Sequence, residues 1–501
     1  MASATRTSTP PQASPEAPGP RLQALGFGGL VVALIWAPWP LGSNRPWAVA
    51  LLAALVWASV VLAAVGAVWR APVQARARAQ AQPPLLPTLV PAAWLPLGAL
   101  LGFAGLVVLQ LLPGLGPNGG ALSIDPFHTR RYLLTTLLYL GGWLLVLLTV
   151  NTRERAEKLL AALLAAGVLQ ALGAVLLYSA GGHYELWYAQ FDQGSRATGT
   201  FVNPDHLAGY MELTLSAGLG WLLAQLGNGQ ADPHAHWRTR VVAGLAFVMS
   251  GKMLLRLLLV VLVITLVMTH SRMGNGAFFI AMGLTGALVA LRSQRLRRPA
   301  LWLVASMAVV DLFIVGQWVG LERVVQRLQD TAEASSDAIA GFGLANAQPP
   351  REESLAQRWE VPRLSLQLVA EKPLLGHGGG TYYTAFPPLK RAGLPWHWDH
   401  AHNDYVQVAC DMGLLGLALG LAVGVATAWR AAQLLRDNVH RVNRGLGVAA
   451  SMALCTLGLH SMVDFNLHIP ANALTFTVIL AAVWALPGAQ NGRQRKTRQR
   501  A

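Results

Sequence analysis

About a dozen long apolar runs limit what this chain can fold into. A membrane-spanning helix needs roughly 20 predominantly apolar residues. The runs that qualify are 24–41, 46–69, 89–112, 132–150, 159–180, 206–226, 253–269, 273–291, 300–319, 405–429, 445–463 and 471–487. Only 12% of the 501 residues are charged, whereas soluble domains carry about 25%. The sequence therefore predicts an all-α polytopic membrane protein with about twelve transmembrane helices.

Lys and Arg residues are distributed unevenly between alternate loops. The richer loops hold Arg21, Arg70, Arg76, Arg78, Arg153, Arg155, Lys158, Arg238, Arg240, Arg292, Arg295, Arg297, Arg298, Arg430, Arg436, Arg441, Arg444 and the cations of 493–500. The opposite short loops hold only Arg45, Arg130, Arg131, Arg196 and Arg272. Because cytoplasmic loops are enriched in Lys and Arg, both termini are expected to face the cytoplasm. This topology accounts for the net charge of +15, and no nucleic-acid partner is expected. The few outer cations run against the rule and need another role.

The loops and tails divide the chain into five expected parts. These are a disordered cytoplasmic tail (1–22), the first nine transmembrane helices (23–319), a large outer loop (320–404), the last three helices (405–487) and a basic cytoplasmic tail (488–501). The large outer loop is expected to be partly helical, with one helix over 321–340 and a second over 355–371 that ends before Pro373. It is the one loop long enough to form a subdomain.

A histidine-rich segment, His-Trp-Asp-His-Ala-His-Asn-Asp-Tyr over 397–405, stands where the large loop returns to the membrane. Ionisable residues at the membrane edge are candidates for function. A histidine can accept a proton near neutral pH, so His402 is the candidate base. The alternatives are an interfacial histidine cluster without chemistry, and a zinc site formed by His397, Asp399, His400 and His402.

Two outer arginines are the candidate anion-binding groups. Arg196 precedes the sixth span, and Arg272 lies in the tight turn Thr269-His270-Ser271-Arg272 between the seventh and eighth spans. A planar guanidinium suits phosphate, and for either arginine alone the alternative is contact with lipid headgroup phosphates. Together with His402 on the same side, the pair favours a site that handles phosphate. No Asp-x-Asp, Walker or Rossmann motif occurs, so neither a metal nor a cofactor is expected.

A further outer segment, from His460 to His468, contains an anion, Asp464. Asp464 is expected either to pair with one of the arginines, to hold His402 in the required tautomer, or simply to cap the last helix. His460 begins the same segment and is grouped with it as a supporting residue.

Several of these segments together resemble the O-antigen ligase/polymerase superfamily of bacterial inner-membrane glycan transferases. The resemblance covers about 190–480. It rests on the segments 196–209, 269–272, 358–359, 371–376, 402–407, 413–416 and 460–464. Through these motifs it adds Asn203, Arg358, Asn403 and Asp404 to the supporting residues.

The resemblance implies transfer of a glycan from undecaprenyl diphosphate to an acceptor hydroxyl, at the periplasmic face of the inner membrane. His402 would be the base, Arg196 and Arg272 would stabilise the departing diphosphate, and the anomeric centre would invert without a metal. The acceptor is left open between another glycan, a lipid A core and a protein hydroxyl. A non-enzymatic transporter of lipid-linked glycans is the alternative from a different class.

Overall fold

The computed structural model describes residues 18–78, 91–180, 183–184, 191–192, 196–225, 250–315, 355–391 and 398–487, and each expected span coincides there with a helix. The helices are α1 (Pro18–Trp36), α2 (Pro46–Arg78), α3 (Trp94–Leu111), α4 (Pro126–Thr149), α5 (Arg153–Ser179), α6 (Pro204–Gln225), α8 (Gly251–Met268), α9 (Arg272–Arg292), α10 (Arg297–Val315), α14 (Asp404–Leu434), α15 (Arg441–His460) and α16 (Pro470–Ala485). Ten helices of the described chain are long and apolar enough to cross a membrane. The all-α polytopic architecture is confirmed. One boundary differs, since α1 already begins within the tail expected at 1–22.

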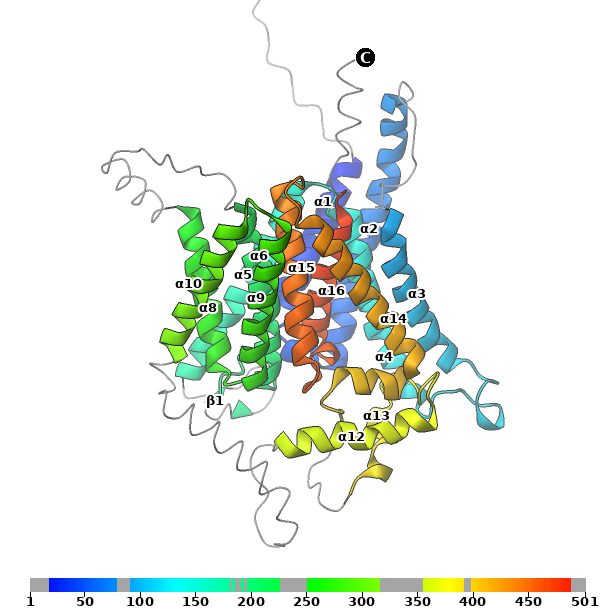
Figure 1. The fold of residues 1–501 in the computed structure, drawn as a ribbon. Helices are drawn as coiled ribbons and strands as arrows, with labels where there is room; N and C mark the ends of the chain where they lie inside the picture. The colour runs from blue at the N-terminus through cyan, green and yellow to red at the C-terminus, as the bar shows by residue number, and fades with distance from the viewer. Residues whose placement is uncertain are drawn as a thin grey trace, which may run out of the picture.

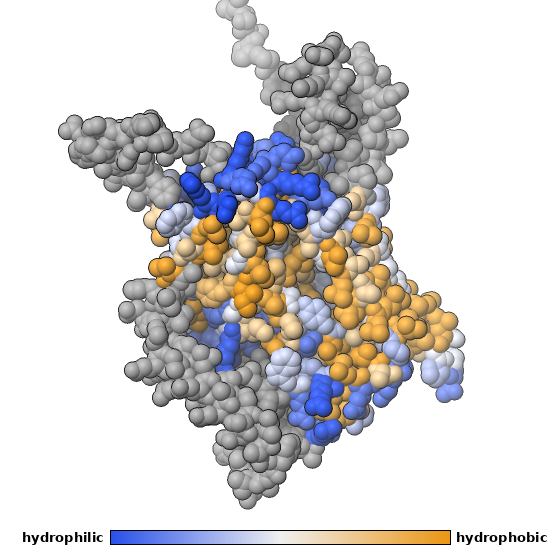
Figure 2. Space-filling model, in the orientation of Figure 1, coloured by the Kyte–Doolittle hydropathy of each residue, from blue (hydrophilic) through white to orange (hydrophobic). Residues whose placement is uncertain are grey.

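The surface of the bundle has the pattern of a membrane protein. Figure 2 shows hydrophobic residues across the middle of the molecule and hydrophilic residues toward both ends. One hydrophilic end lies where α14 ends and α15 begins (Figure 1). The opposite end carries α12 (Leu355–Glu371) and α13 (Tyr382–Ala385), the two helices immediately before α14. Exposed leucine and tryptophan side chains in this hydrophobic middle zone are therefore expected to face lipid.

Two helices, α6 and α15, form the centre of the bundle (Figure 1). In α6 94% of the membrane-spanning window is buried inside the protein, and in α15 78% is buried. Gly220 and Gly445 let the two backbones approach, because a Cβ on Gly220 would collide with the carbonyl oxygen of Gly445. Small residues allow such close helix packing in membranes. Polar groups at the ends of α6 and α15 are therefore held beside one another.

The described part of the large loop packs against the beginning of α14. It contains α12 (Leu355–Glu371), which has the predicted bounds, and α13 (Tyr382–Ala385). The loop also contains η6 (Pro387–Leu389). The short elements elsewhere in the described chain are η1 (Leu41–Ser43), η2 (Pro91–Ala93), η3 (Pro117–Gly119), η7 (Asn466–His468) and an antiparallel pair, β1 (His183–Tyr184) and β2 (Phe191–Asp192). Val361, Tyr382, Phe386, Trp398 and Cys410 share one buried apolar cluster. This cluster fixes the loop on α14 next to the histidine-rich segment. The helix expected over 321–340 lies outside the described residues.

Helix α14 is interrupted at Gly413, where φ is 68° and ψ is −179°. A neighbouring segment supplies partners for the backbone groups at the break: Leu414 N donates to Pro373 O over 2.7 Å, and Gly378 N donates to Asp411 O over 2.9 Å. The Gln110 amide also donates to Asp411 O over 3.0 Å. Irregular backbone at membrane depth is tolerated where the protein satisfies it in this way.

Replacing Gly413 by alanine is expected to lower the stability of the protein. The backbone at Gly413 is in a region that is essentially restricted to glycine, which costs about 1–3 kcal/mol for other residues. A Cβ there would also collide with the Leu374 carbonyl oxygen. Thermal unfolding of the detergent-solubilised protein measures the effect. Gly420→Ala in the same helix is the control, because a Cβ at Gly420 meets nothing within 4 Å. An unchanged midpoint for Gly413→Ala would contradict the described break.

Candidate active site

Arg196 connects the segment before α6 to the turn between α8 and α9. Its Nε donates to Thr269 O over 2.9 Å, and its Nη2 forms an ion pair with Asp205 Oδ1 over 2.6 Å. Ala197 N also donates to Met268 O over 3.0 Å. Arg272 is the first residue of α9, immediately after the same turn. The structure therefore brings the segments of the two predicted arginines into contact.

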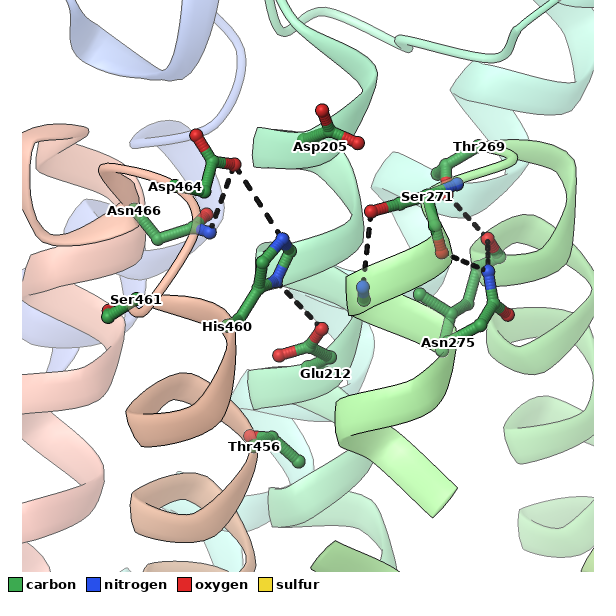
Figure 3. A network of polar contacts seen from close by, with 12 residues as sticks. Asp205, Glu212, Thr269, Ser271, Asn275, Thr456, His460, Ser461, Asp464 and Asn466 are labelled. Carbon is green, nitrogen blue, oxygen red and sulfur yellow. Dashed lines mark hydrogen bonds and ion pairs between the residues drawn. The ribbon is translucent and has the colours of Figure 1, made fainter. Parts of the chain in front are cut away.

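Local capping sets the positions of both arginines. Ser271 caps α9, because its hydroxyl accepts a hydrogen bond from Gly274 N over 3.2 Å (Figure 3). Asn203 precedes α6, and its side-chain oxygen accepts from Asp205 N over 2.8 Å. A polar side chain that caps a helix typically contributes about 1 kcal/mol. Asn203 thus orients the start of α6, which carries the carboxylate partner of Arg196.

His402 stands at the start of α14 in a left-handed backbone conformation, with φ of 49°. The next residue, Asn403, caps α14: its side-chain oxygen accepts from Val406 N over 3.0 Å, and its amide donates to Met462 O over 2.8 Å. The second bond ties the histidine-rich segment to the segment after α15. The buried His402 ring contacts Trp398 and Phe465 edge to face, with centroids 5.1 and 5.0 Å apart.

Three histidines from two separate segments of the chain contact the ring of Phe465. His400 stacks on its ring at 4.0 Å between centroids, His402 meets it edge to face, and His206 of α6 meets it edge to face at 4.6 Å. His206 directly follows Asp205, the partner of Arg196. A short series of contacts, from Arg196 through α6 and Phe465, therefore connects the first predicted cation to the predicted base.

A buried polar network lies at the junction of α6 and α15 (Figure 3). His460 Nδ1 and Glu212 Oε1 are 2.9 Å apart, and His460 Nε2 lies 3.6 Å from Asp464 Oδ2. His206 Nε2 lies 3.7 Å from Asp464 Oδ1. Asp464 also accepts from Phe465 N over 2.9 Å. Because the side chains of Glu212, His460 and Asp464 are at most 1% exposed, the network fixes how α6 and α15 meet at this end.

Replacing Glu212 by leucine is expected to destabilise the protein by about 3–5 kcal/mol, because His460 would lose its closest carboxylate inside the bundle. The midpoint of thermal unfolding measures the loss. In the double variant Glu212→Leu, His460→Leu no unpaired imidazole remains, so part of the stability should return. Two effects that simply add would show that the two side chains are not coupled.

A second network surrounds Asp404, the first residue of α14. Its carboxylate accepts from Ser461 Oγ over 2.6 Å and from Leu467 N over 3.0 Å, and it pairs with His468 Nδ1 over 2.8 Å. Burial opposes the charged form of His468, but the hydrogen bond and charge of Asp404 outweigh it and raise the pKa of His468. Burial instead lowers the pKa of neighbouring His400 well below its usual value. The pKa values of the two adjacent rings are therefore shifted in opposite directions.

A cavity of about 630 Å³ lies beside this second network. Its wall combines apolar residues of α14, α15 and α16 with a polar end that includes Arg131, Asp399, His400, Asp404 and His468. Residues Arg196, Arg272 and His402 are not among its lining residues in the described chain. Of the three histidines around Phe465, His400 lines the cavity, whereas His206 and His402 are not among its lining residues.

The predicted site residues thus fall into three groups. In the first group, Arg196 contacts the turn that precedes Arg272, and His402 is connected to this region through the rings of Phe465 and His206. Asp464, His460 and Asp404 belong to the two buried networks. Arg358 lies in α12, but its side chain is outside the described residues, as is the whole of His397. Among the described residues, no group of three His, Cys, Asp or Glu side chains is arranged to hold a metal ion.

Three residues of this region were missed by sequence reasoning: Glu212, Phe465 and His468. Glu212 had a usable signal, since an acidic residue inside an apolar span usually has a buried partner or a function. It also lies seven residues after Asp205, which places both on one face of α6. Phe465 and His468 had no comparable signal, because their importance depends on partners distant in sequence.

The comparisons with known proteins agree with this architecture. Residues 257–421 match the protein-family model described as O-Antigen ligase. The matched part runs from α8 into α14 and includes Arg272 and His402. This match, over part of the chain, supports its resemblance to the O-antigen ligase superfamily and, in general terms, glycosyl transfer of the ligase or polymerase type. No match was found among curated proteins.

Proposed function

We propose that this protein transfers a glycan from undecaprenyl diphosphate to an acceptor hydroxyl, with inversion at the anomeric carbon. His402 removes the proton from the acceptor hydroxyl while that oxygen attacks the anomeric carbon. The bond between this carbon and the diphosphate oxygen breaks, and the diphosphate leaves with the electron pair. Arg196 and Arg272 stabilise the negative charge on the leaving group, which is the role of fixed cations in such steps.

The observation that carries this proposal is the contact between the Arg196 segment and the α8–α9 turn, continued through His206 and Phe465 to His402. These groups come from three outer segments of the sequence, yet they adjoin at one end of the bundle. Asp205 supports the arrangement, because it orients the Arg196 guanidinium while leaving other N–H groups of its fork for a ligand.

The proposal places this end of the bundle at the periplasmic face and both termini in the cytoplasm. The distribution of charge supports this orientation. Arg430, Arg436, Arg441 and Arg444 gather at the opposite end, around the junction of α14 and α15. Such enrichment is typical of the cytoplasmic side. A donor and an acceptor could then meet at the outer edge of the bilayer, away from cytoplasmic water and nucleotides.

The direct test is transfer by the purified protein in vesicles that contain an undecaprenyl-diphosphate glycan. Candidate acceptors are offered one at a time: a lipid A core, a second lipid-linked glycan and a protein with accessible serine and threonine hydroxyls. Transfer to one of them, with inverted anomeric configuration by NMR, is expected. Transport of the donor across the vesicle membrane without any product would instead support the transporter alternative.

Chelation is expected to leave the transfer rate unchanged. In this mechanism the two guanidinium groups provide the charge stabilisation that a divalent cation provides in metal-dependent transferases. The rate is measured in vesicles before and after incubation with EDTA, followed by gel filtration. If activity were lost and then restored by Mg²⁺ or Mn²⁺, the two arginines would not be sufficient to stabilise the leaving group.

A further inference from the structure

Helix α12 of the large loop has three sides of different character. Each residue turns the helix by about 100°, so the side chains can be sorted by their direction from the axis. The buried side, which packs on the loop and on the start of α14, consists of Val361, Leu364, Ser365 and Leu368. A polar side consists of Glu360, Arg363, Gln367 and Glu371. The third side is exposed and apolar, and it consists of Trp359, Leu366 and Ala370.

The third side forms one continuous surface, which we call the α12 stripe. Trp359 is 59% exposed and Leu366 is 54% exposed. With Ala370 they lie within about 40° of one another around the helix axis. A single exposed apolar side chain needs no explanation, whereas apolar side chains gathered on one surface indicate contact with a partner. A helix that packed on the loop and otherwise met only water would need two sides, not three.

The end of α12 joins the stripe to the lipid-facing surface of the bundle. The carbonyl oxygens of Pro373 and Leu374, just after α12, accept from Leu414 N over 2.7 Å and from Leu415 N over 3.3 Å. Leu374, Leu414 and Leu415 are all exposed. Leu414 and Leu415 directly follow the break in α14, where its long apolar part begins. Helix α12 therefore ends at the height at which α14 enters the membrane.

The orientation of α12 suits a helix that lies on a membrane surface. Figure 1 shows α12 lying across the end of the bundle, roughly perpendicular to α15 and α16. A helix in this orientation keeps its whole length at one depth. Tryptophan favours the boundary between membrane and water, and Arg363, beside the stripe, can extend its charged end toward water or lipid phosphate. Helices of this kind bury an apolar face by about 5–10 Å among headgroups and acyl chains.

We propose that α12 is an interfacial helix, whose stripe of Trp359, Leu366 and Ala370 rests on the lipid leaflet at this end of the bundle. The partner is a lipid surface because the stripe continues through Leu374 into the lipid-facing leucines of α14. Through its buried side, α12 then connects the membrane surface to the first turns of α14. This contact does not depend on the proposed transfer reaction.

Spin labels measure the depth of the stripe in a bilayer. Trp359→Cys and Leu366→Cys are introduced singly into the full-length protein, in which Cys410 and Cys455 are replaced by alanine, and the nitroxide-labelled protein is placed in phospholipid nanodiscs. Oxygen concentrates in the bilayer and a nickel chelate stays in water, so the ratio of their collision rates with the label reports depth. At both positions this ratio should exceed that at Gln367→Cys by about fivefold or more, since the stripe is buried and the polar side is not.

Gln367→Cys is the matched control, because Gln367 is the exposed neighbour of Leu366 and points about 100° away from it, on the polar side of α12. Leu415→Cys gives the reference value for a lipid-facing position. Asn438→Cys gives the reference for water, because Asn438 is exposed between α14 and α15 at the opposite end. Equal midpoints of thermal unfolding for the labelled variants show that α12 remains packed on the loop.

Each outcome supports the proposal or overturns it. Ratios near that of Leu415→Cys at both stripe positions, with a low ratio at Gln367→Cys, support an interfacial helix. Ratios as low as that of Asn438→Cys at both stripe positions would place the stripe in water and overturn it. Low collision rates with both reagents would also overturn it, because protein would then cover the stripe. In that case, spin–spin broadening that disappears on dilution with unlabelled protein would identify the cover as a second copy of the chain.

Discussion

Replacing His402 by asparagine lowers the rate of glycan transfer by about 10²–10⁴-fold, the usual contribution of a general base. Asparagine is chosen because His402 has a positive φ of 49°, a conformation that asparagine tolerates better than alanine does. The backbone and the Asn403 cap are then preserved while the proton acceptor is lost. Transfer in reconstituted vesicles, at equal protein in the membrane, measures the effect.

His440→Asn is the matched control for this prediction. His440 caps α15 at the opposite end of the bundle, with its Nδ1 accepting from Val442 N, and asparagine is also a good helix cap. This variant should transfer glycan at the normal rate. If His402→Asn retained a normal rate as well, another group would have to be the base, and adjacent His400 would be the first candidate to test.

Lysine at Arg196 or Arg272 is expected to reduce transfer by about 10²–10³-fold, a loss comparable to that of one oxyanion donor. Lysine keeps the charge but loses the planar fork. At Arg196 the fork is already used, because Nε donates to Thr269 O and Nη2 donates to Asp205, and the proposed mechanism assigns the remaining N–H groups to the diphosphate. A lysine ammonium cannot span these contacts. The steady-state kcat should fall, since the interaction is needed most as the leaving group gains charge.

Arg130→Lys is the control for both arginine variants, because Arg130 is an exposed cation that takes part in none of the described site contacts. A normal rate is expected for it. Retention of full activity in Arg196→Lys and Arg272→Lys would show that only positive charge is required. Bidentate recognition of the diphosphate would then be wrong, although the charge requirement itself would remain.

Features encoded locally were predicted well from the sequence. All twelve apolar runs coincide with helices, because hydrophobic length alone determines them. The helix Leu355–Glu371 has its predicted bounds, since its periodicity and the following Pro373 are local signals. The turn before Arg272 was also expected to be tight, and α9 begins at that residue. The sequence could thus place the outer segments, one by one, along the chain.

Features that depend on distant partners were not predictable in the same way. Glu212 and His460 are 248 positions apart and meet because α6 and α15 pack at the centre. The sequence around Gly413 is a continuous apolar run and gives no sign of a break in the helix. The break depends on Pro373 and Gln110, which are distant in sequence and satisfy its backbone groups. In the sequence, Phe465 is an ordinary apolar residue, and nothing near it indicates the histidines that contact its ring. The roles of His402, Arg196 and Arg272 remain predictions, although their segments adjoin.

A structure of the protein bound to undecaprenyl diphosphate tests the central claim most directly. The account predicts that the diphosphate contacts the guanidinium groups of both Arg196 and Arg272, and that the His402 ring faces the adjoining space where the sugar would begin. A diphosphate bound at Arg131 and His468 instead, with Arg196 and Arg272 away from it, would contradict the account.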